Sequence, residues 1–301
     1  MAKKIIFPLL YISFASSVHG MSFKSIAQQT LATQAAKRVQ LMRQFSNAPQ
    51  GNYKAPFEQE RKNFCAMLTT KKPWALVAQK NITELAHKER ELMSVLLKIN
   101  GASVSDFDRL KSINQRNFRC MEQKGVLESN ALYTNLIWKA GVDRVRTLLE
   151  NYGIHPLAVG MQQIDKATHL KVCVGQTVFA INEKFIKEHL HDRNMFNAFV
   201  HHEIQHLLHN DCYTKVLLRS MLTYTVKDPK RSESYIAEFA RFQEERADKL
   251  AALNSPRTAL ALVQFFSSQK DNPHDMHHPL ISKRAEYVHK LYHEMLATIK
   301  K

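Results

Sequence analysis

The sequence is poor in glycine and cysteine and has no long apolar run. It has 8 Gly and 4 Cys in 301 residues, and glycine so far below the usual ~7% favours long helices over turn-rich β-structure. No apolar run reaches the ~18–20 residues that a membrane-spanning helix needs, which excludes a polytopic membrane protein. The 43 Lys+Arg against 27 Asp+Glu give a net charge of +16. The composition predicts a folded, basic protein of one large or two modest domains.

Residues 1–20 have the layout of a secretory signal peptide. Lys3 and Lys4 precede the apolar stretch Ile5–Val18, and small residues follow up to Gly20. We expect cleavage after Gly20, a periplasmic or secreted protein, and no membrane span in the cleaved chain. A buried N-terminal helix or an uncleaved tether is the alternative.

Export changes the interpretation of the four cysteines. An even number of cysteines in an exported chain favours disulfide bonds. We predict the pairs Cys65–Cys120 and Cys173–Cys212, each within one half of the chain. Four buried free thiols are the alternative. No C-x-x-C pair occurs, which is unfavourable for a zinc site built from cysteines.

The hydrophobic pattern divides the chain into two regions after the signal peptide. Residues 21–134 have helical periodicity on both sides of a linker at Asn47–Pro56 and form a predicted helical N-terminal region. Residues 135–301 form a second predicted domain, in which Leu170–Val174 and Thr177–Ile181 are short β-rich runs and the rest is helical. The predicted fold class is therefore α+β and mostly helical, with a small β-sheet.

His202, Glu203 and His206 form the motif H-E-x-x-H within an apolar segment that predicts a helix. Four residues make slightly more than one helical turn, so both imidazoles project from one face and can hold one Zn²⁺. Glu203 is placed to take a proton from a zinc-bound water that attacks a carbonyl. A histidine-rich polar helix face is the alternative.

A second motif, E-x-x-x-D, offers a third ligand. Another class of zinc peptidase has its third histidine ten residues after the first, but Cys212 stands there. Glu244 is preferred to Glu245 because it has Asp248 one turn away on the same face. Asp248 can accept the outer N–H of a ligand histidine, which we predict to be His202. An i,i+4 surface pair is the alternative.

The order of the motifs resembles a known family. R-x-x-E-x-x-A-D over Arg241–Asp248, following H-E-x-x-H, is similar to the pattern of the gluzincin zinc metallopeptidases of family 48, the relatives of the CAAX prenyl protease, HtpX and BepA. The segment His278–Arg284 resembles the H-P-x-x-x-x-R element of that family. The resemblance covers about residues 135–295 and does not reach the front helices.

The resemblance implies that residues 135–301 are a zincin-like catalytic domain with metalloendopeptidase activity. One Zn²⁺ per chain would be held by His202, His206 and Glu244, with Glu203 as the general base. Asp248 and Arg241 would support the ligands from behind. The implied partner is a polypeptide substrate.

His278 belongs to a loop that also contains His274 and His277. If this loop folds over the zinc, His278 can donate a hydrogen bond to the oxyanion of the reaction, or it can occupy the place of the reacting water and keep the enzyme latent. The third reading is a solvated histidine at a helix start with Pro279 at the first position. Arg284 is expected to be a structural salt-bridge partner.

The predicted function is that of an exported zinc endopeptidase acting on envelope or unfolded proteins. The strand Thr177–Ile181 is the predicted edge strand that would hold an extended substrate. A non-catalytic, chaperone-like or envelope-binding protein on the same fold is the alternative. The dispersed positive charge favours attraction to acidic envelope surfaces. No nucleic-acid-binding module is recognisable, so no nucleic-acid partner is expected.

Overall fold

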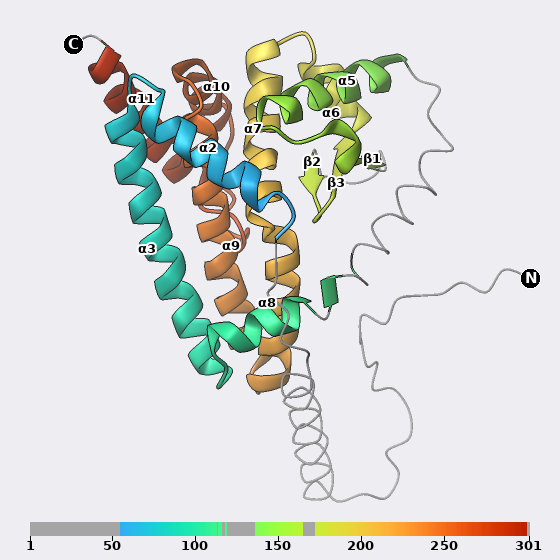
Figure 1. The fold of residues 1–301 in the computed structure, drawn as a ribbon, viewed down its shortest axis with the longest axis vertical. Coiled ribbons are helices and arrows are strands. Elements are labelled where there is room, and N and C mark those ends of the chain that lie inside the picture. The colour runs from blue at the N-terminus through green and yellow to red at the C-terminus, as the bar shows by residue number, and fades with distance from the viewer. Residues whose placement is uncertain (1–54, 113, 116–117, 119–135, 165–171, 300–301) are drawn as a thin grey trace, which may run out of the picture. The chain divides into compact units, whose positions relative to one another are not determined.

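The computed structural model describes residues 55–112, 114–115, 118, 136–164 and 172–299, all of which belong to one unit of the chain. The predicted signal peptide lies outside these ranges. The described part is mostly helical with one small sheet (Figure 1), which confirms the predicted α+β class at this level.

The helices include two from the predicted N-terminal region and seven from the predicted catalytic domain. Their bounds are α2 (Glu58–Thr70), α3 (Ala75–Ile99), α5 (Leu136–Asn151), α6 (Glu183–His189), α7 (Arg193–His209), α8 (Asp211–Thr225), α9 (Pro229–Ala252), α10 (Pro256–Ser267) and α11 (Ile281–Ile299). A short 3₁₀ helix covers Pro156–Ala158. Within the described ranges, no helix has the length and apolar character required to cross a bilayer.

Local signals in the sequence start the helices around the site. Asp192 accepts hydrogen bonds from the backbone of the first turn of α7, and Asp228 does the same for α9. Both are N-cap residues that satisfy amide groups left without a helical partner. Between α7 and α8, Asn210 has φ 55°, a left-handed conformation that asparagine tolerates and that ends the first helix before the second begins.

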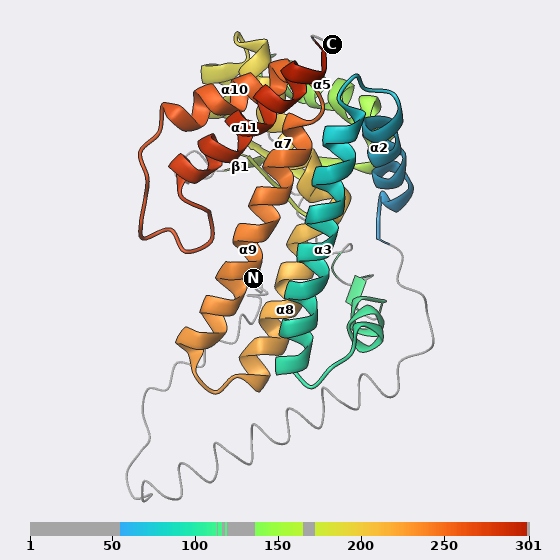
Figure 2. The same cartoon turned by 90° about the vertical axis from the view of Figure 1, so that its left-hand side faces the viewer.

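Helix α7 lies at the centre of the packing. It contacts α2, α5, α8, α9 and α10, and its side chains Val200, Ile204, Leu207 and Leu208 are completely buried. Helix α9 in turn contacts α3, α7 and α8, and these long helices run beside one another (Figures 1 and 2). Helices α2 and α3 of the front region therefore pack directly on the two helices that carry the motifs.

The sheet has the strand order β1-β3-β2, with β1 at Gly160–Ile164, β2 at Val172–Val174 and β3 at Val178–Asn182. Strand β3 pairs in parallel with β1 and antiparallel with β2. The predicted edge strand at residues 177–181 was therefore wrong, because β3 is central and uses its backbone groups on both sides. The run GMQQI carries no strong strand signal, and its pairing as β1 covers one side of β3.

The disulfide prediction also needs correction. Cys65 on α2 is a free, half-buried thiol, which contradicts the predicted Cys65–Cys120 bond. Burial raises the pKa of this thiol, so it is a poor nucleophile despite the opposing charge of Arg61. Cys120 and the side chain of Cys173 lie outside the described residues, so the second pair stays a prediction. Cysteine spacing along a chain does not determine which thiols approach within bonding distance.

Candidate metal centre

The packing of α7 on α9 brings His202, His206 and Glu244 together. One donor atom from each side chain lies within 4.8 Å of the others. The two Nε2 atoms are 3.0 Å apart. Nε2 of His202 lies 3.4 Å from Oε2 of Glu244, and Nε2 of His206 lies 3.4 Å from Oε1 of the same carboxylate. Two nitrogen ligands of one tetrahedral Zn²⁺, each at ~2.0–2.1 Å, would be about 3.3 Å apart. The three side chains thus converge at a spacing close to that of a zinc site.

The far side of each imidazole faces a buried carboxylate. Nδ1 of His202 lies 2.8 Å from Asp248 Oδ1, and Nδ1 of His206 lies 2.8 Å from Asp211 Oδ2. Because an ionised carboxylate only accepts hydrogen bonds, each imidazole carries its proton on Nδ1 when it is in the neutral form that binds a metal. Each Nε2 then presents a lone pair to the same space as the Glu244 carboxylate. Three converging electron-rich atoms fit a cation, and this N, N, O donor set suits zinc.

Asp248 is completely buried and held by cations. Arg284 donates two hydrogen bonds of 2.8 Å to its carboxylate, and the Tyr287 hydroxyl donates another. Burial alone would raise the pKa of Asp248, but the charges of Arg284 and His202 keep this pKa below its ordinary value. Arg284 also lies 3.3 Å from Glu244. It therefore joins Glu244, the predicted third ligand, to the carboxylate behind His202.

Glu203 follows His202 on α7 and is half-buried. Within the described ranges, no hydrogen bond or ion pair holds its carboxylate. Burial raises the pKa of Glu203, and the neighbouring charge of Glu244 adds to this effect, whereas His202 and His206 oppose it. A carboxylate with a raised pKa and no fixed partner is suited to accepting and returning a proton.

Glu245, the competing ligand, faces away from the histidines. Its carboxylate pairs with Lys88 of α3 and with Lys249, one turn on along α9. These contacts account for its pKa below the ordinary value despite partial burial. The choice between the two adjacent glutamates follows from helix geometry, because neighbouring residues project about 100° apart.

The histidine loop before α11 lies against the cluster. Nδ1 of His278 is 2.8 Å from Asp275, and its Nε2 is 3.7 Å from Glu244, while 46% of its side chain is exposed. Helix α11 begins at Ile281, so Pro279 is not its first residue. His278 therefore faces the cluster at the end of a loop, although half of it meets solvent.

Arg241 contacts this loop and not the predicted ligands. Its Nη1 donates a hydrogen bond of 2.6 Å to the carbonyl of Met276. In the same loop, Nε2 of His277 lies 3.0 Å from Glu233 of α9. The predicted role of Arg241 directly behind the ligands thus differs from its position, because the residue lies almost one helical turn before Glu244 and reaches the neighbouring loop.

Sequence reasoning missed Asp211, the first residue of α8. It lies five residues after His206, beyond the end of α7, and no helical spacing connects the two. Only the left-handed turn at Asn210 directs its carboxylate back to the His206 ring. An acidic residue just after the helix with the H-E-x-x-H motif was the one available signal.

His201 has a structural environment although it precedes His202. Its Nδ1 lies 2.8 Å from the Tyr152 hydroxyl, and its Nε2 lies 3.2 Å from the Asn254 amide. Burial, together with the charges of Arg144 and Lys72, lowers the pKa of His201 to about 4. This imidazole is therefore neutral and belongs to the core.

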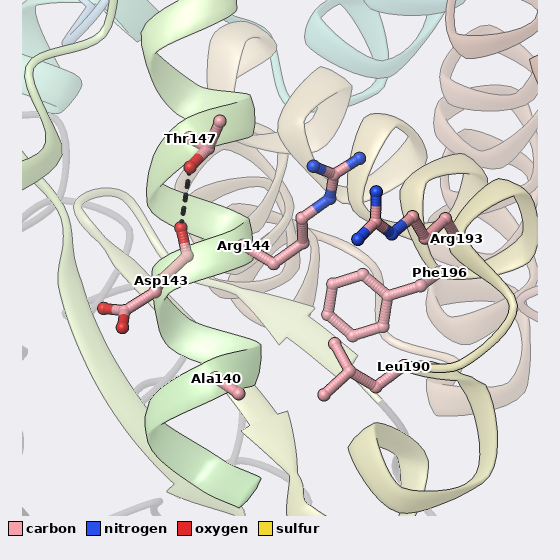
Figure 3. Close-up of a pocket in the computed structure, with 7 residues that line it drawn as sticks. All are labelled: Ala140, Asp143, Arg144, Thr147, Leu190, Arg193 and Phe196. Atoms are coloured by element: carbon pink, nitrogen blue, oxygen red, sulfur yellow. Dashed lines mark hydrogen bonds between the residues drawn. The ribbon is translucent and has the colours of Figure 1, made fainter. Parts of the chain in front are cut away.

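A separate pocket of about 340 Å³ lies between α5 and the start of α7. Figure 3 shows the guanidinium groups of Arg144 and Arg193 facing each other above Phe196. Arg144 is oriented by a hydrogen bond of 2.9 Å from its Nε to Asn197. None of the metal-centre residues lines this pocket.

Comparisons of the chain with protein-family models, with curated proteins and with solved structures return no match.

Proposed function

We propose that this protein is a zinc-dependent endopeptidase with a zincin-like catalytic domain. The observation that supports this most is the convergence of two imidazole Nε2 atoms and the Glu244 carboxylate, with each Nδ1 directed to a buried carboxylate. The order of the three sequence motifs, which resembles that of family 48 peptidases, points to the same activity. One Zn²⁺ per chain would be held by His202, His206 and Glu244.

When bound at these ligands, Zn²⁺ supplies the Lewis acidity that activates water and polarises a scissile carbonyl. Glu203 accepts the proton of the attacking water and returns it to the leaving amine. Its burial favours the protonated form that has to persist between the two steps. Asp248 and Asp211 keep the two ligand rings in the orientation and tautomer that the site needs.

His278 is our candidate for the donor to the oxyanion, because its Nε2 faces the cluster while Asp275 holds its Nδ1. We expect His278→Ala to bind zinc and to cleave substrate more slowly. A faster variant would show instead that this imidazole blocks the site and keeps the enzyme latent.

The proposed substrates are unfolded or extended polypeptides of the cell envelope. Of the two edge strands, β2 contacts α7, the helix with the H-E-x-x-H motif. An extended peptide added to β2 would form backbone hydrogen bonds beside the site, which gives affinity with little dependence on sequence. Export and attraction to acidic surfaces are part of the same proposal and derive from residues 1–20 and from the net charge.

The test compares four purified proteins for zinc content and for cleavage of an unfolded protein. We expect the wild type to bind one zinc and cleave, and Glu203→Gln to bind zinc but cleave roughly 10²–10⁴-fold more slowly. Glu244→Gln should lose zinc, whereas Glu245→Gln, the matched control at the next position, should retain zinc and activity. A wild type that binds zinc and cleaves no better than Glu203→Gln would support the non-catalytic alternative.

A further inference from the structure

Behind His206 lies a chain of charged side chains that reaches helix α3 of the N-terminal region. Asp211, which faces His206 Nδ1, also accepts a hydrogen bond from Arg246 of α9. The other terminal nitrogen of Arg246, Nη1, lies 2.6 Å from Oε1 of Glu89 on α3. Asp211 and Arg246 are only 4% and 3% exposed. Four helices thus contribute to a single line of contacts, with His206 on α7, Asp211 on α8, Arg246 on α9 and Glu89 on α3.

The same arrangement serves the other ligand histidine. Nδ1 of His202 faces Asp248, and Asp248 is held by the guanidinium of Arg284. Each ligand imidazole therefore has a buried carboxylate, and each carboxylate has a buried arginine. Asp248 and Arg284 are defining positions of the E-x-x-x-D and H-P-x-x-x-x-R motifs. Asp211 and Glu89 lie outside these motifs, and Arg246 is an unspecified position within the segment Arg241–Asp248.

Asp211 and its two charged neighbours, Arg246 and Glu89, hold the His206 ring in one orientation for a physical reason. A carboxylate with one hydrogen-bonded oxygen can rotate, whereas Asp211 is held on Oδ2 by His206, on Oδ1 by Arg246, and at its backbone carbonyl by Gln243. A buried carboxylate and guanidinium have lost their hydration, so each depends on the other for compensation. Glu89 accepts a hydrogen bond from Nη1 of Arg246 and thereby fixes the direction from which the guanidinium approaches Asp211.

We propose that Asp211, Arg246 and Glu89 are positioning residues for the metal ligand His206, so that helix α3 contributes to zinc affinity. The inference depends on the proposed metal centre but not on peptidase activity. It assigns a role to one of the front helices, whose titratable residues carry no recognisable motif.

The experiment measures zinc affinity of the full chain by competition with a chromophoric chelator. Asp211→Asn keeps the shape of the side chain and removes its charge, and we expect zinc binding 10–100-fold weaker, as for other residues that orient metal ligands. Glu89→Gln acts one step further away, on a half-exposed side chain, and we expect a smaller but measurable loss. An Arg246 variant would leave Asp211 buried without its cation and risks misfolding. Glu89→Gln is therefore used in its place to test whether the contact of Arg246 with α3 affects zinc affinity.

Lys88→Gln is the matched control. Lys88 is adjacent to Glu89 and forms a neighbouring contact between α3 and α9, with Glu245, but this contact does not lead to a ligand. We expect its zinc affinity to equal that of the wild type. The absorption spectrum of Co²⁺-substituted protein gives a second measurement, because it reports ligand geometry and not fold stability. The spectrum should shift in Asp211→Asn and stay unchanged in Lys88→Gln.

Two results would overturn the inference while leaving the proposed function intact. The first is wild-type zinc affinity in Asp211→Asn. The second is an equal loss in Glu89→Gln and Lys88→Gln, which would show that the contact between the helices matters only for stability. A wild type without zinc affinity would overturn the proposed function and the inference together.

Discussion

Replacing Arg284 by methionine should destabilise the protein strongly because it leaves a buried carboxylate without its cation. Arg284 is 8% exposed and Asp248 is 0% exposed, and two hydrogen bonds of 2.8 Å join them. The guanidinium also lies over the Phe266 ring, 4.4 Å from its centroid. Methionine fills a similar volume and keeps an apolar contact with that ring, so the main loss is electrostatic.

Removal of one partner from a buried ion pair costs about 3–5 kcal/mol. For a domain of this size a change of 1 kcal/mol moves the melting temperature by about 2–4 °C, so the Arg284→Met variant should melt roughly 6–20 °C lower than the wild type. Denaturant unfolding of the zinc-free protein measures the free energy directly and excludes effects of metal loss. The control is Arg219→Gln, which breaks an exposed pair with Glu233 and should cost less than about 1 kcal/mol.

A second substitution tests the cause. If the cost comes from the unpaired charge, Asp248→Leu in the Arg284→Met background should destabilise far less than the sum of the two single changes, because both charges are then absent. Additive effects in this double-mutant cycle, or a cost of Arg284→Met as small as that of the exposed control, would refute the reasoning.

Two further predictions concern packing and pH. Gly141→Ala on α5 would place its Cβ 2.6–2.9 Å from three side-chain atoms of buried Ile186. Unfolding experiments should therefore show a loss of stability of about 1–3 kcal/mol from overpacking, reduced by up to ~1 kcal/mol because alanine has the higher helix propensity. Ile186→Ala should destabilise this variant less than it destabilises the wild type, and an equal cost would contradict the predicted clash. Folding lowers the pKa of His201 to about 4 from an ordinary value near 6.5. Between these two pH values the unfolded chain therefore binds more protons than the folded protein. The stability conferred by the neutral imidazole is complete above pH 6.5 and is lost as the pH falls towards 4, by up to about 3 kcal/mol. Chelator-treated His201→Asn should lack this component, and parallel stability curves of variant and wild type over this pH range would disprove it.

The local part of the candidate site was accessible from the sequence. The spacing of His202 and His206 predicted a shared helix face, and α7 places their Nε2 atoms 3.0 Å apart. The spacing of Glu244 and Asp248 selected the glutamate that the structure directs towards the histidines. Both inferences need only the helical repeat, which acts over four residues and does not depend on the rest of the fold. The mostly helical class followed in the same way from periodicity and scarce glycine.

Contacts between distant segments were not accessible. The pairing of β1 with β3, the free thiol of Cys65, and the contact of Arg241 with the histidine loop each depend on which segments meet in space. The sequence by itself determined which side chains share a helix face, since that is a matter of short-range geometry. Only the tertiary structure decided that Asp211, Arg246 and Glu89 would meet behind His206, because their approach depends on the packing of α3, α8 and α9 around α7, which no local repeat encodes.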